Sequence, residues 1–585
     1  MQNKRVEKKE LTILMIAGCL LGILCFGIVY GFKIVNPLYD GWMFGGDMDL
    51  KQHYVGFCHF RTTPWHFPIG LIDTLSVPYS MSVVYTDSIP LFAVVFKIFS
   101  NLLPLHFQYF GIFGLISFML MGMLSPVLIR RFCDNKFLCI LGSLFFILSF
   151  PILHRMYYHT ALSAQWIIVL SLIIWSYIDI TDTKNLKKLC IYWALIGFIA
   201  VSIHSYFVFM SGIVLAAQII DGIVRLYIIE SDLSSNKKIS FLKICVQNIY
   251  VFIPLVCMGI TSFTLLYLLG GFYGKGSVSG LGFGSFNANL SSYFNPLTYG
   301  SIFKGFELYG DFEFEGFAYV GAGILLILLA MGVNAIYVRT KKGSNQHPEG
   351  SSNNHGSNEQ DRIAVSTVWV FVGVIIVVLL ASCFPCFSIG SIKLIKFPVP
   401  KFLEKVFGIC RTNARFVWVG MYIIIASALW FVGSNFKKLW VKIIFSLAII
   451  IQLFDLSGLI ALKHEKYAKD ETFVSVWESL DKEYGLTEGK DEFVFMYGDS
   501  DIMMDTAFYA YQHGMSQNSY YYARTIYDEI NENIAEWSEK FLAGDISDSV
   551  VYVFRDEDYT EGFSKVAKEL GANVYRFDGH VAVTR

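Results

Sequence analysis

The sequence predicts a polytopic α-helical membrane protein of about 11 transmembrane helices, followed by a C-terminal extracytoplasmic α/β domain. Of its 585 residues 55% are hydrophobic and 16% are charged, where soluble domains carry about 25% charged residues. Apolar runs of about 20 residues recur, which is the length that crosses a ~30 Å hydrocarbon layer. Residues 461–585 carry 12 basic and 25 acidic residues, against 34 and 22 in residues 1–460. We therefore expect a membrane domain over 1–460 and a soluble domain over 461–585.

Clusters of Lys and Arg mark the cytoplasmic ends of membrane spans and so orient the chain. The basic start, MQNKRVEKKE, places the N-terminus in the cytoplasm. The apolar run that follows is too long for a signal-peptide core and lacks a small-residue cleavage site, so we expect a retained helix in the cell (cytoplasmic) membrane. The expected spans are residues 11–32, 108–130, 137–153, 160–180, 189–203, 206–229, 243–270, 317–339, 363–381, 415–433 and 441–460.

Residues 33–106 form a long first external loop in this topology. Its apolar stretch 88–105 contains Lys97 and is bounded by prolines, so we expect it to lie in the membrane interface or to re-enter. Counting it as a span would move the basic pair Arg130-Arg131 outside and break the charge pattern.

The acidic tail alternates between strand and helix patterns. EFVFMYG (492–498), SVVYVFR (549–555) and NVYRFDGHVAVT (573–584) alternate like half-buried strands, and residues 528–545 and 559–572 are typical of helices that end at glycine. These patterns predict a small α/β domain after the last span, joined to it by a linker near residues 461–471.

Unusual polar residues gather at the external ends of the expected spans. Charged groups near a bilayer cost free energy unless they are solvated or paired, so their placement is informative. Guanidinium groups match phosphate oxygens bidentately, and a neighbouring carboxylate can act as a general base on a hydroxyl. The alternative is that these residues only face lipid headgroups. The set comprises His154, Arg155, His159, His204, Ser205, Tyr206, Asp311, Glu313, Glu315, Arg411 and Arg415.

The first external loop contains the stretch GGDMDLKQHYVGF, residues 45–57. Asp47 and Asp49 are two residues apart, and Asp40 and Asp87 lie in the same loop. Solvated loops are often rich in aspartate, but this one is also rich in aromatic residues, which suit a folded interfacial structure and stack on sugar rings. We therefore expect a catalytic aspartate in this loop.

Other signals are weak or absent. The chain has no GxxxxGK[ST], HExxH or GxSxG motif, and no basic run interleaved with aromatics that would indicate nucleic acid. GLGFG (280–284) has no strand before it. The pair Cys383 and Cys386 forms a lone CxxC, for which a disulfide, a metal site and plain packing are all open.

Several segments together resemble bacterial multi-pass proteins of the DUF6311 type, which are similar to the GT-C glycosyltransferase superfamily. They are spread over roughly residues 37–420, and the tail has the length and place of that family's external domain. The segments are GGDMDLKQHYVGFCHFRTTPWHFPIG (45–70), VYTDSIPLFAVVFK (84–97), HSYFVFMSG (204–212), GFGSFNANLSSYFNP (282–296), FEGFAYVGAG (314–323) and RTNARFVW (411–418).

This resemblance implies a glycosyltransferase that moves a sugar from a polyprenyl-phosphate carrier to an extracytoplasmic glycan, lipid or protein, with a catalytic acid just after the first span. Asp49 fits that place, four residues before His53, but the inserted DM leaves open whether Asp47 or Asp49 is the base. The two could also bind a divalent cation, Mg²⁺ or Mn²⁺; the aspartate pair is compatible with a reaction that uses a metal ion and with one that does not. The implied binding residues are Arg155, Arg411 and Arg415 for phosphate, Asp87, His204 and Glu315 for sugar and acceptor, and His53, His159 and Tyr206 beside them.

Two alternatives belong to other classes. A lipid-linked sugar flippase or transporter would use the same cationic cavity, but it would show two pseudo-symmetric halves or charged helices near the bilayer midplane, and neither is evident in the sequence. A non-catalytic surface assembly protein would use its tail as a binding module.

Overall fold

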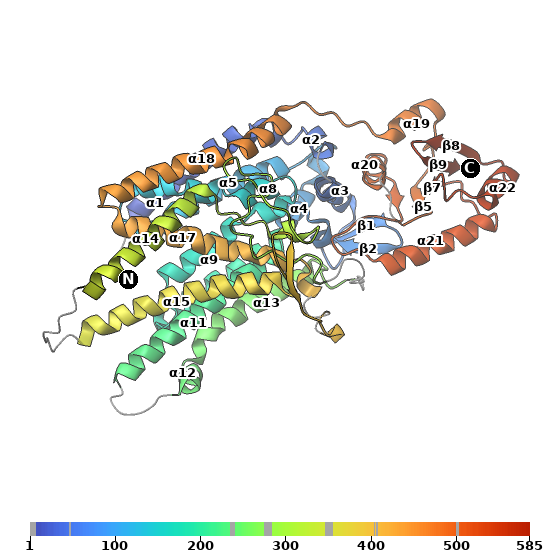
Figure 1. The fold of residues 1–585 in the computed structure, drawn as a ribbon. Coiled ribbons are helices and arrows are strands. Elements are labelled where there is room, and N and C mark those ends of the chain that lie inside the picture. The colour runs from blue at the N-terminus through green and yellow to red at the C-terminus, as the bar shows by residue number, and fades with distance from the viewer. Residues whose placement is uncertain are drawn as a thin grey trace.

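The computed structural model describes residues 8–45, 48–233, 240–273, 283–344, 355–402, 404, 408–498 and 502–585. Within these ranges ten helices are long and apolar enough to cross a membrane, which identifies a membrane protein. The N-terminal end of α1 lies at one end of the bundle, and the C-terminal region lies at the opposite end (Figure 1). The helices of these spans are α1 (Lys8–Tyr30), α5 (Phe110–Arg130), α9 (Trp166–Tyr177), α10 (Leu186–Ile203), α11 (Tyr206–Leu233), α13 (Ile253–Leu268), α14 (Ala322–Ser344), α15 (His355–Cys383), α17 (Val417–Asn435) and α18 (Leu439–Ala468). Preceding 3-10 turns extend α9 to a span of Thr160–Tyr177 and α13 to a span of Ile249–Leu268.

The segment expected to form a single span over residues 137–153 is instead broken into three short helices. These are α6 (Lys136–Gly142), α7 (Leu144–Ile147) and α8 (Phe150–Arg155). Ser149 is extended and Pro151 sits in the first turn of α8. Because Pro151 has no N–H to donate and Ser149 before it is extended, α7 does not continue into α8. The break leaves Arg155 fully buried at the end of α8.

Helices α1 and α5 flank the first loop and pack at very close range. A Cβ placed on Gly18 would lie 2.0 Å from the carbonyl oxygen of Gly122, and one on Gly122 would lie 2.2 Å from that of Gly18. Small residues allow the backbones of membrane helices to approach in this way. Because α1 leads into the first loop and α5 leads out of it, this contact fixes both ends of the loop.

The first loop is folded throughout the part that the structure describes. Residues 88–105, expected in the interface, contain α4, which is nine residues long and too short to cross a membrane. The elements of the loop are η1 (Lys33–Val35), α2 (Gly41–Phe44), α3 (Met48–Thr62), β1 (Leu71–Ser76), β2 (Tyr79–Ser82), η2 (Val83–Thr86), α4 (Pro90–Ile98) and η3 (Ser100–Leu102).

Shorter elements join the long helices. The antiparallel hairpin β3–β4 follows α15 directly and precedes η8 and η9, which lead into α17. Cys383 and Cys386, at the start of this hairpin, are buried free thiols. The remaining elements are η4 (Thr160–Ser163), η5 (Thr183–Asn185), α12 (Phe241–Gln247), η6 (Ile249–Phe252), η7 (Glu313–Gly316), β3 (Cys386–Ile389), β4 (Ile392–Lys396), η8 (Gly408–Cys410) and η9 (Asn413–Phe416).

The C-terminal region contains a five-stranded mixed sheet in the order β6-β5-β7-β9-β8. β5 runs parallel to β6 and β7, and β9 runs antiparallel to β7 and β8. The expected strands at 492–498 and 549–555 are present, as are the two expected helices. The elements are α19 (Val476–Tyr484), β5 (Glu492–Phe495), α20 (Met503–His513), β6 (Ser516–Gln517), α21 (Tyr527–Leu542), β7 (Val550–Arg555), α22 (Glu561–Glu569), β8 (Asn573–Phe577) and β9 (His580–Thr584).

The segment 573–584, expected as one alternating strand, is a hairpin of β8 and β9. Asp578 has φ +40° and Gly579 has φ +76° at its turn. An Asp-Gly pair readily adopts the left-handed conformations of a two-residue turn, so the chain reverses there.

The C-terminal sheet is docked on the first loop through α20 and β6 (Figure 1). The ring of His59 on α3 contacts the carbonyl oxygen of Ala507 on α20 at 2.7 Å. The backbone N–H of Val77 donates to the carbonyl of Gln517 at 3.0 Å. α18 continues past residue 460 to Ala468, and the N–H of Glu471 just beyond it donates to the Tyr39 hydroxyl at 3.0 Å. The segment that connects α18 to the C-terminal domain is therefore hydrogen-bonded to the first loop.

We expect Gly122→Leu to destabilise the protein, because the added side chain must separate α1 from α5. Overpacking of this kind costs about 1–3 kcal/mol, and the thermal midpoint in detergent should fall. The matched control is Gly332→Leu on α14, where a new Cβ meets nothing within 4 Å. Equal midpoints for the two variants would contradict the close packing of α1 and α5.

Candidate active site

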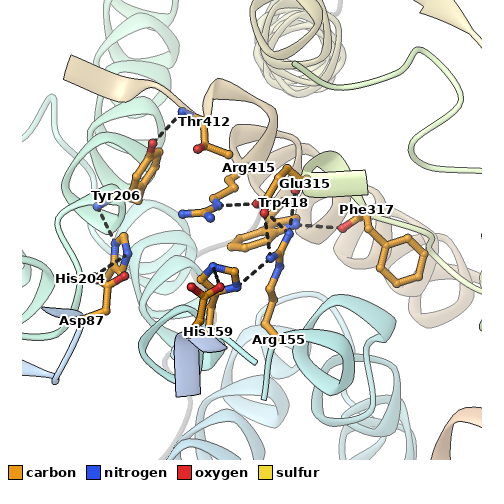
Figure 2. Close-up of polar contacts among 11 residues, drawn as sticks. Asp87, Arg155, His159, His204, Tyr206, Glu315, Phe317, Thr412, Arg415 and Trp418 are labelled. Carbon is orange, nitrogen blue, oxygen red and sulfur yellow. Dashed lines mark hydrogen bonds and ion pairs between the residues drawn. The ribbon is translucent and has the colours of Figure 1, made fainter. Parts of the chain in front are cut away.

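A buried carboxylate that joins two arginines forms the centre of the candidate site (Figure 2). Glu315 accepts hydrogen bonds from Arg155, with Nη2 to Oε2 at 2.9 Å and Nη1 to Oε1 at 3.3 Å. Nε of Arg415 donates to the same Oε2 at 2.8 Å. Burial alone would raise the pKa of Glu315, but the charges of Arg155 and Arg415 hold it well below its usual range. The three groups therefore carry a net positive charge.

A second chain of contacts leads from this cluster to the first loop. Nη1 of Arg155 lies 3.1 Å from Nδ1 of His159. Nε2 of His159 lies 3.0 Å from Oδ2 of Asp49. Because Arg155 can only donate, Nδ1 of His159 accepts and Nε2 donates its proton to Asp49. The path from Glu315 to Asp49 is thus a continuous series of polar contacts.

A separate branch starts at Asp87. Nε2 of His204 lies 3.5 Å from Oδ1 of Asp87, and Nδ1 of His204 accepts from the N–H of Tyr206 at 3.2 Å. The hydroxyl of Tyr206 accepts from the N–H of Thr412 at 2.8 Å. The guanidinium of Arg415 lies over the Tyr206 ring, 5.0 Å from its centroid, so the branch meets the arginine cluster there.

Local backbone structure explains the position of each acid. Asp49 lies in the first turn of α3, where the helix N-terminus stabilises a negative charge. Asp87 follows η2 with φ +51°, a left-handed conformation that aspartate adopts more readily than most residues. Arg155 ends the short helix α8, where a cation is favoured.

The two aspartates differ in acidity. Burial raises the pKa of Asp49, but the hydrogen bond from His159 opposes burial and the pKa lies below its ordinary value. Burial raises the pKa of Asp87 to about 6. Asp49 is therefore ionised across the physiological range, whereas Asp87 gains a proton under mild acid.

Two histidines of the site are neutral. Burial lowers the pKa of His53 to about 3. Both ring nitrogens of His53 are buried without a partner among the residues that the structure describes, and its ring centroid lies 6.4 Å from that of His159. Burial and the charge of Arg415 lower the pKa of His204 well below its ordinary value. A neutral imidazole both donates and accepts, so His53 has unused capacity for a ligand.

The structure brings together nine of the expected residues, Asp49, His53, Asp87, Arg155, His159, His204, Tyr206, Glu315 and Arg415. Arg411 is half-buried, with its guanidinium 5.2 Å from the centroid of the Phe286 ring. Asp47, the expected partner of Asp49, lies outside the described residues. Glu313 is not part of this cluster. Its carboxylate accepts a hydrogen bond from Asn289 at 2.7 Å and so stabilises the loop before α14.

A segment of the C-terminal domain also reaches this region, and sequence reasoning missed it. We call residues 520–524 the strap. Three of its bonds to the membrane part end one or two residues from an expected site residue. These bonds are Tyr520 Oη to the Gln52 carbonyl (3.0 Å), Ala523 N to the Tyr85 carbonyl (2.8 Å) and Arg524 Nη2 to the Ile409 carbonyl (2.7 Å). A fourth bond joins the hydroxyls of Ser76 and Tyr522 at 3.3 Å.

Tyr521 lies in the middle of the strap and is half-buried. Burial, followed by the charge of Asp49, raises the pKa of Tyr521 to about 12, and Asp87 adds to this effect while Arg411 opposes it. The only hint in the sequence is the unusual run YYYAR in an otherwise acidic tail.

Among the described residues, no group of three or more His, Cys, Asp or Glu side chains is placed to hold a metal ion. The nearest donor to Asp49 is His159, which uses its Nε2 proton on that carboxylate. Asp47, the other expected ligand, lies outside the described residues, so the Mg²⁺ or Mn²⁺ site stays a prediction.

Fold and site together define a polytopic membrane protein with a buried acid–histidine–arginine network at one end of its bundle. The chain belongs to the DUF6311 family: the model "Domain of unknown function (DUF6311)" matches residues 19–457, and "DUF6311 C-terminal domain" matches residues 484–585. No curated protein matches the chain.

The solved structures include the Archaeoglobus fulgidus oligosaccharyltransferase in the apo form, to which the chain is similar at 11% identity and a TM-score of 0.42. The match covers 96% of this chain and 71% of that one. A likeness of this size is below the level that shows a common fold.

We expect Glu315→Gln to lower stability strongly, because it leaves two buried arginines without a counter-charge. Breaking a buried ion pair on one side costs about 3–5 kcal/mol. Thermal unfolding in detergent should show the loss, with the exposed Glu307→Gln of the same loop as control. A Glu315→Gln midpoint equal to that of the control would show that the cluster carries no structural role.

Proposed function

We propose that this protein is a membrane glycosyltransferase of the GT-C type that moves a sugar from a polyprenyl-phosphate carrier to an extracytoplasmic glycan, lipid or protein. The observation that carries the proposal is the buried cluster of Arg155, Glu315 and Arg415, joined through His159 to Asp49. Such a transferase needs a cation for the leaving phosphate and a carboxylate for the acceptor hydroxyl, and the cluster offers both within one network.

Arg415 is the group we assign to the carrier phosphate. It uses only Nε on Glu315, and its two terminal nitrogens make no hydrogen bond to the described residues. Arg155, in contrast, holds Glu315 with both of its terminal nitrogens. Arg415 can therefore present a pair of donors to a phosphate while it stays fixed by Glu315. The half-buried Arg411 lies four residues earlier and adds positive charge.

Asp49 is the group we assign to the acceptor. Its carboxylate is ionised, and the hydrogen bond from His159 holds it in one orientation. In the reaction, an acceptor oxygen attacks the anomeric carbon of the sugar as its proton passes to Asp49, and the bond to the carrier phosphate breaks. The electron pair leaves on the phosphate, where Arg415 stabilises the new charge.

The strap forms the wall of this site that the C-terminal domain supplies. Aromatic rings stack on sugar faces and their hydroxyls form hydrogen bonds, so we assign Tyr521 to contact with a sugar. The protein acts in the cell membrane, with its N-terminus in the cytoplasm and its C-terminal domain outside. Arg130 and Lys136 pair with Glu10 near the start of α1, and cationic clusters of this kind mark the cytoplasmic ends of spans.

We expect Asp49→Asn to abolish sugar transfer from a labelled carrier lipid while the thermal midpoint changes little. The amide keeps the shape of the carboxylate but cannot take a proton. Asp311→Asn, an exposed substitution in another loop of the same end, should transfer normally. Transfer that persists in Asp49→Asn removes Asp49 as the base, and carrier transport by the wild type without any product indicates a flippase.

The pH profile should separate the two aspartates. Asp87 is protonated below about pH 6, and a base must be ionised, so a reaction that used Asp87 would slow as the pH falls through that value. The pKa of Asp49 is below its ordinary value, and we therefore expect kcat/KM to stay level there. A fall centred near pH 6 would move the role of base to Asp87.

A further inference from the structure

A basic, apolar hairpin projects from the bundle near the site. We call residues 386–402 the basic hairpin. Its strands β3 and β4 pair from Cys386 with Lys396 to Ile389 with Ile392, with a register shift between Phe387 and Ser388, and the turn uses Gly390 at φ +55°. The hairpin begins three residues after the end of α15, a helix that is apolar enough to span a membrane.

The outer strand of this hairpin is uncovered on both faces. All five residues of β4 are exposed, so neither its odd nor its even side chains pack on the protein. Contiguous exposed apolar surface of this kind marks an interaction site. The large apolar side chains left in the open are Ile389, Ile392, Leu394, Ile395, Phe397 and Phe402.

A neighbouring loop enlarges this surface. Asn289 clasps the hairpin turn, with Nδ2 donating to the Gly390 carbonyl at 2.9 Å and Oδ1 accepting from the Gly390 N–H at 3.0 Å. The ring of Phe306 lies beside the same turn, 3.5 Å from where a Cβ of Gly390 would be. The exposed large apolar side chains of that loop are Ile302, Phe303, Phe306 and Tyr309, and Lys304 and Glu307 are exposed beside them.

The basic hairpin carries charge of one sign only. Lys393, Lys396 and Lys401 are exposed, and residues 383–403 contain no Asp or Glu. None of the three lysines forms an ion pair with a described residue. Alternating lysine and aliphatic residues are typical of surfaces that bury their apolar groups in a bilayer while the amines reach headgroup phosphates.

Strand β3 is hydrogen-bonded to a neighbouring loop, so the exposed strand β4 is paired with a fixed part of the protein. Nδ2 of Asn287 donates to the Cys386 carbonyl at 3.0 Å, and the N–H of Leu290 donates to the Ser388 carbonyl at 3.0 Å. The hairpin extends sideways from the bundle, across the direction of the long helices (Figure 1). This is the direction in which a membrane surface runs.

We propose that the basic hairpin lies on the membrane surface at the end of the bundle that carries the C-terminal domain, with its aliphatic side chains in the interface and its lysines on anionic lipid phosphates. A second copy of the chain is a poorer occupant, because two such hairpins would bring six lysines together. Contact with anionic lipid satisfies both the apolar side chains and the charge. The inference stands independently of the proposed transferase activity.

The test uses the full-length protein in nanodiscs that hold one chain each. A fluorescent non-natural amino acid is placed at Leu394, and brominated acyl chains act as the quencher. We expect loss of fluorescence comparable to that of the same label at Phe263, an exposed position on α13. The matched water-facing control is Leu542 in the C-terminal domain, which is also exposed. A Leu394 signal that behaves like the Leu542 signal would overturn the proposal.

The charge is tested in the same labelled protein. Lys393, Lys396 and Lys401 are replaced together by Gln, and discs of phosphatidylcholine are compared with discs that contain phosphatidylglycerol. We expect quenching in the original protein to increase with the anionic lipid, and this increase to vanish in the triple variant. An increase that survives the substitution, or its absence in the original protein, would overturn the role of the lysines.

Discussion

The arrangement of this site depends on one carboxylate placed between two guanidinium groups. Charges removed from water at this depth are costly unless each finds a partner, and Glu315 serves Arg155 and Arg415 together. Because α8, η7 and η9 supply one residue each, the same contacts fix three separate segments of the chain. The positions of His159 and Tyr206 follow, since each contacts one of the two arginines.

The site lies at an end of the bundle and draws on parts that are distant in sequence. The first loop provides Asp49 and Asp87, the helix ends provide the histidines and arginines, and the C-terminal domain provides the strap. This one-sided placement is suited to chemistry at a membrane surface, where a lipid-borne group and a water-borne group can meet. Transporters instead place their charged groups near the bilayer midplane.

Much of the site could be predicted from sequence because its residues interrupt apolar runs. His204 and Tyr206 interrupt a hydrophobic stretch, and Arg155 and Arg415 lie at the edges of others. Polar residues cost free energy in a membrane, so their presence there indicates a function and they can be picked out from the sequence. The topology then placed them at one end. Their pairing was not visible, because nothing in the local sequence indicates that Glu315 rather than Glu313 reaches the arginines.

What could not be predicted rests on long-range packing or on single backbone breaks. The strap reaches the site only because α20 docks on α3, and these helices are separated by several hundred residues. The break before α8 depends on Pro151, which a count of apolar residues ignores, and the turn at Asp578 divides a pattern that alternates without interruption. Hydrophobic periodicity reports which face is buried, not which distant partner covers it.

The contribution of the strap has a consequence for the order in which the protein is made. Residues 520–524 leave the ribosome after every membrane helix, and they complete the site only when the domain around them has folded and docked. A chain still in synthesis therefore holds its arginines and aspartates without the contacts of the strap. The finished site appears with the last tenth of the chain, so a truncated protein inserts in the membrane yet stays incomplete.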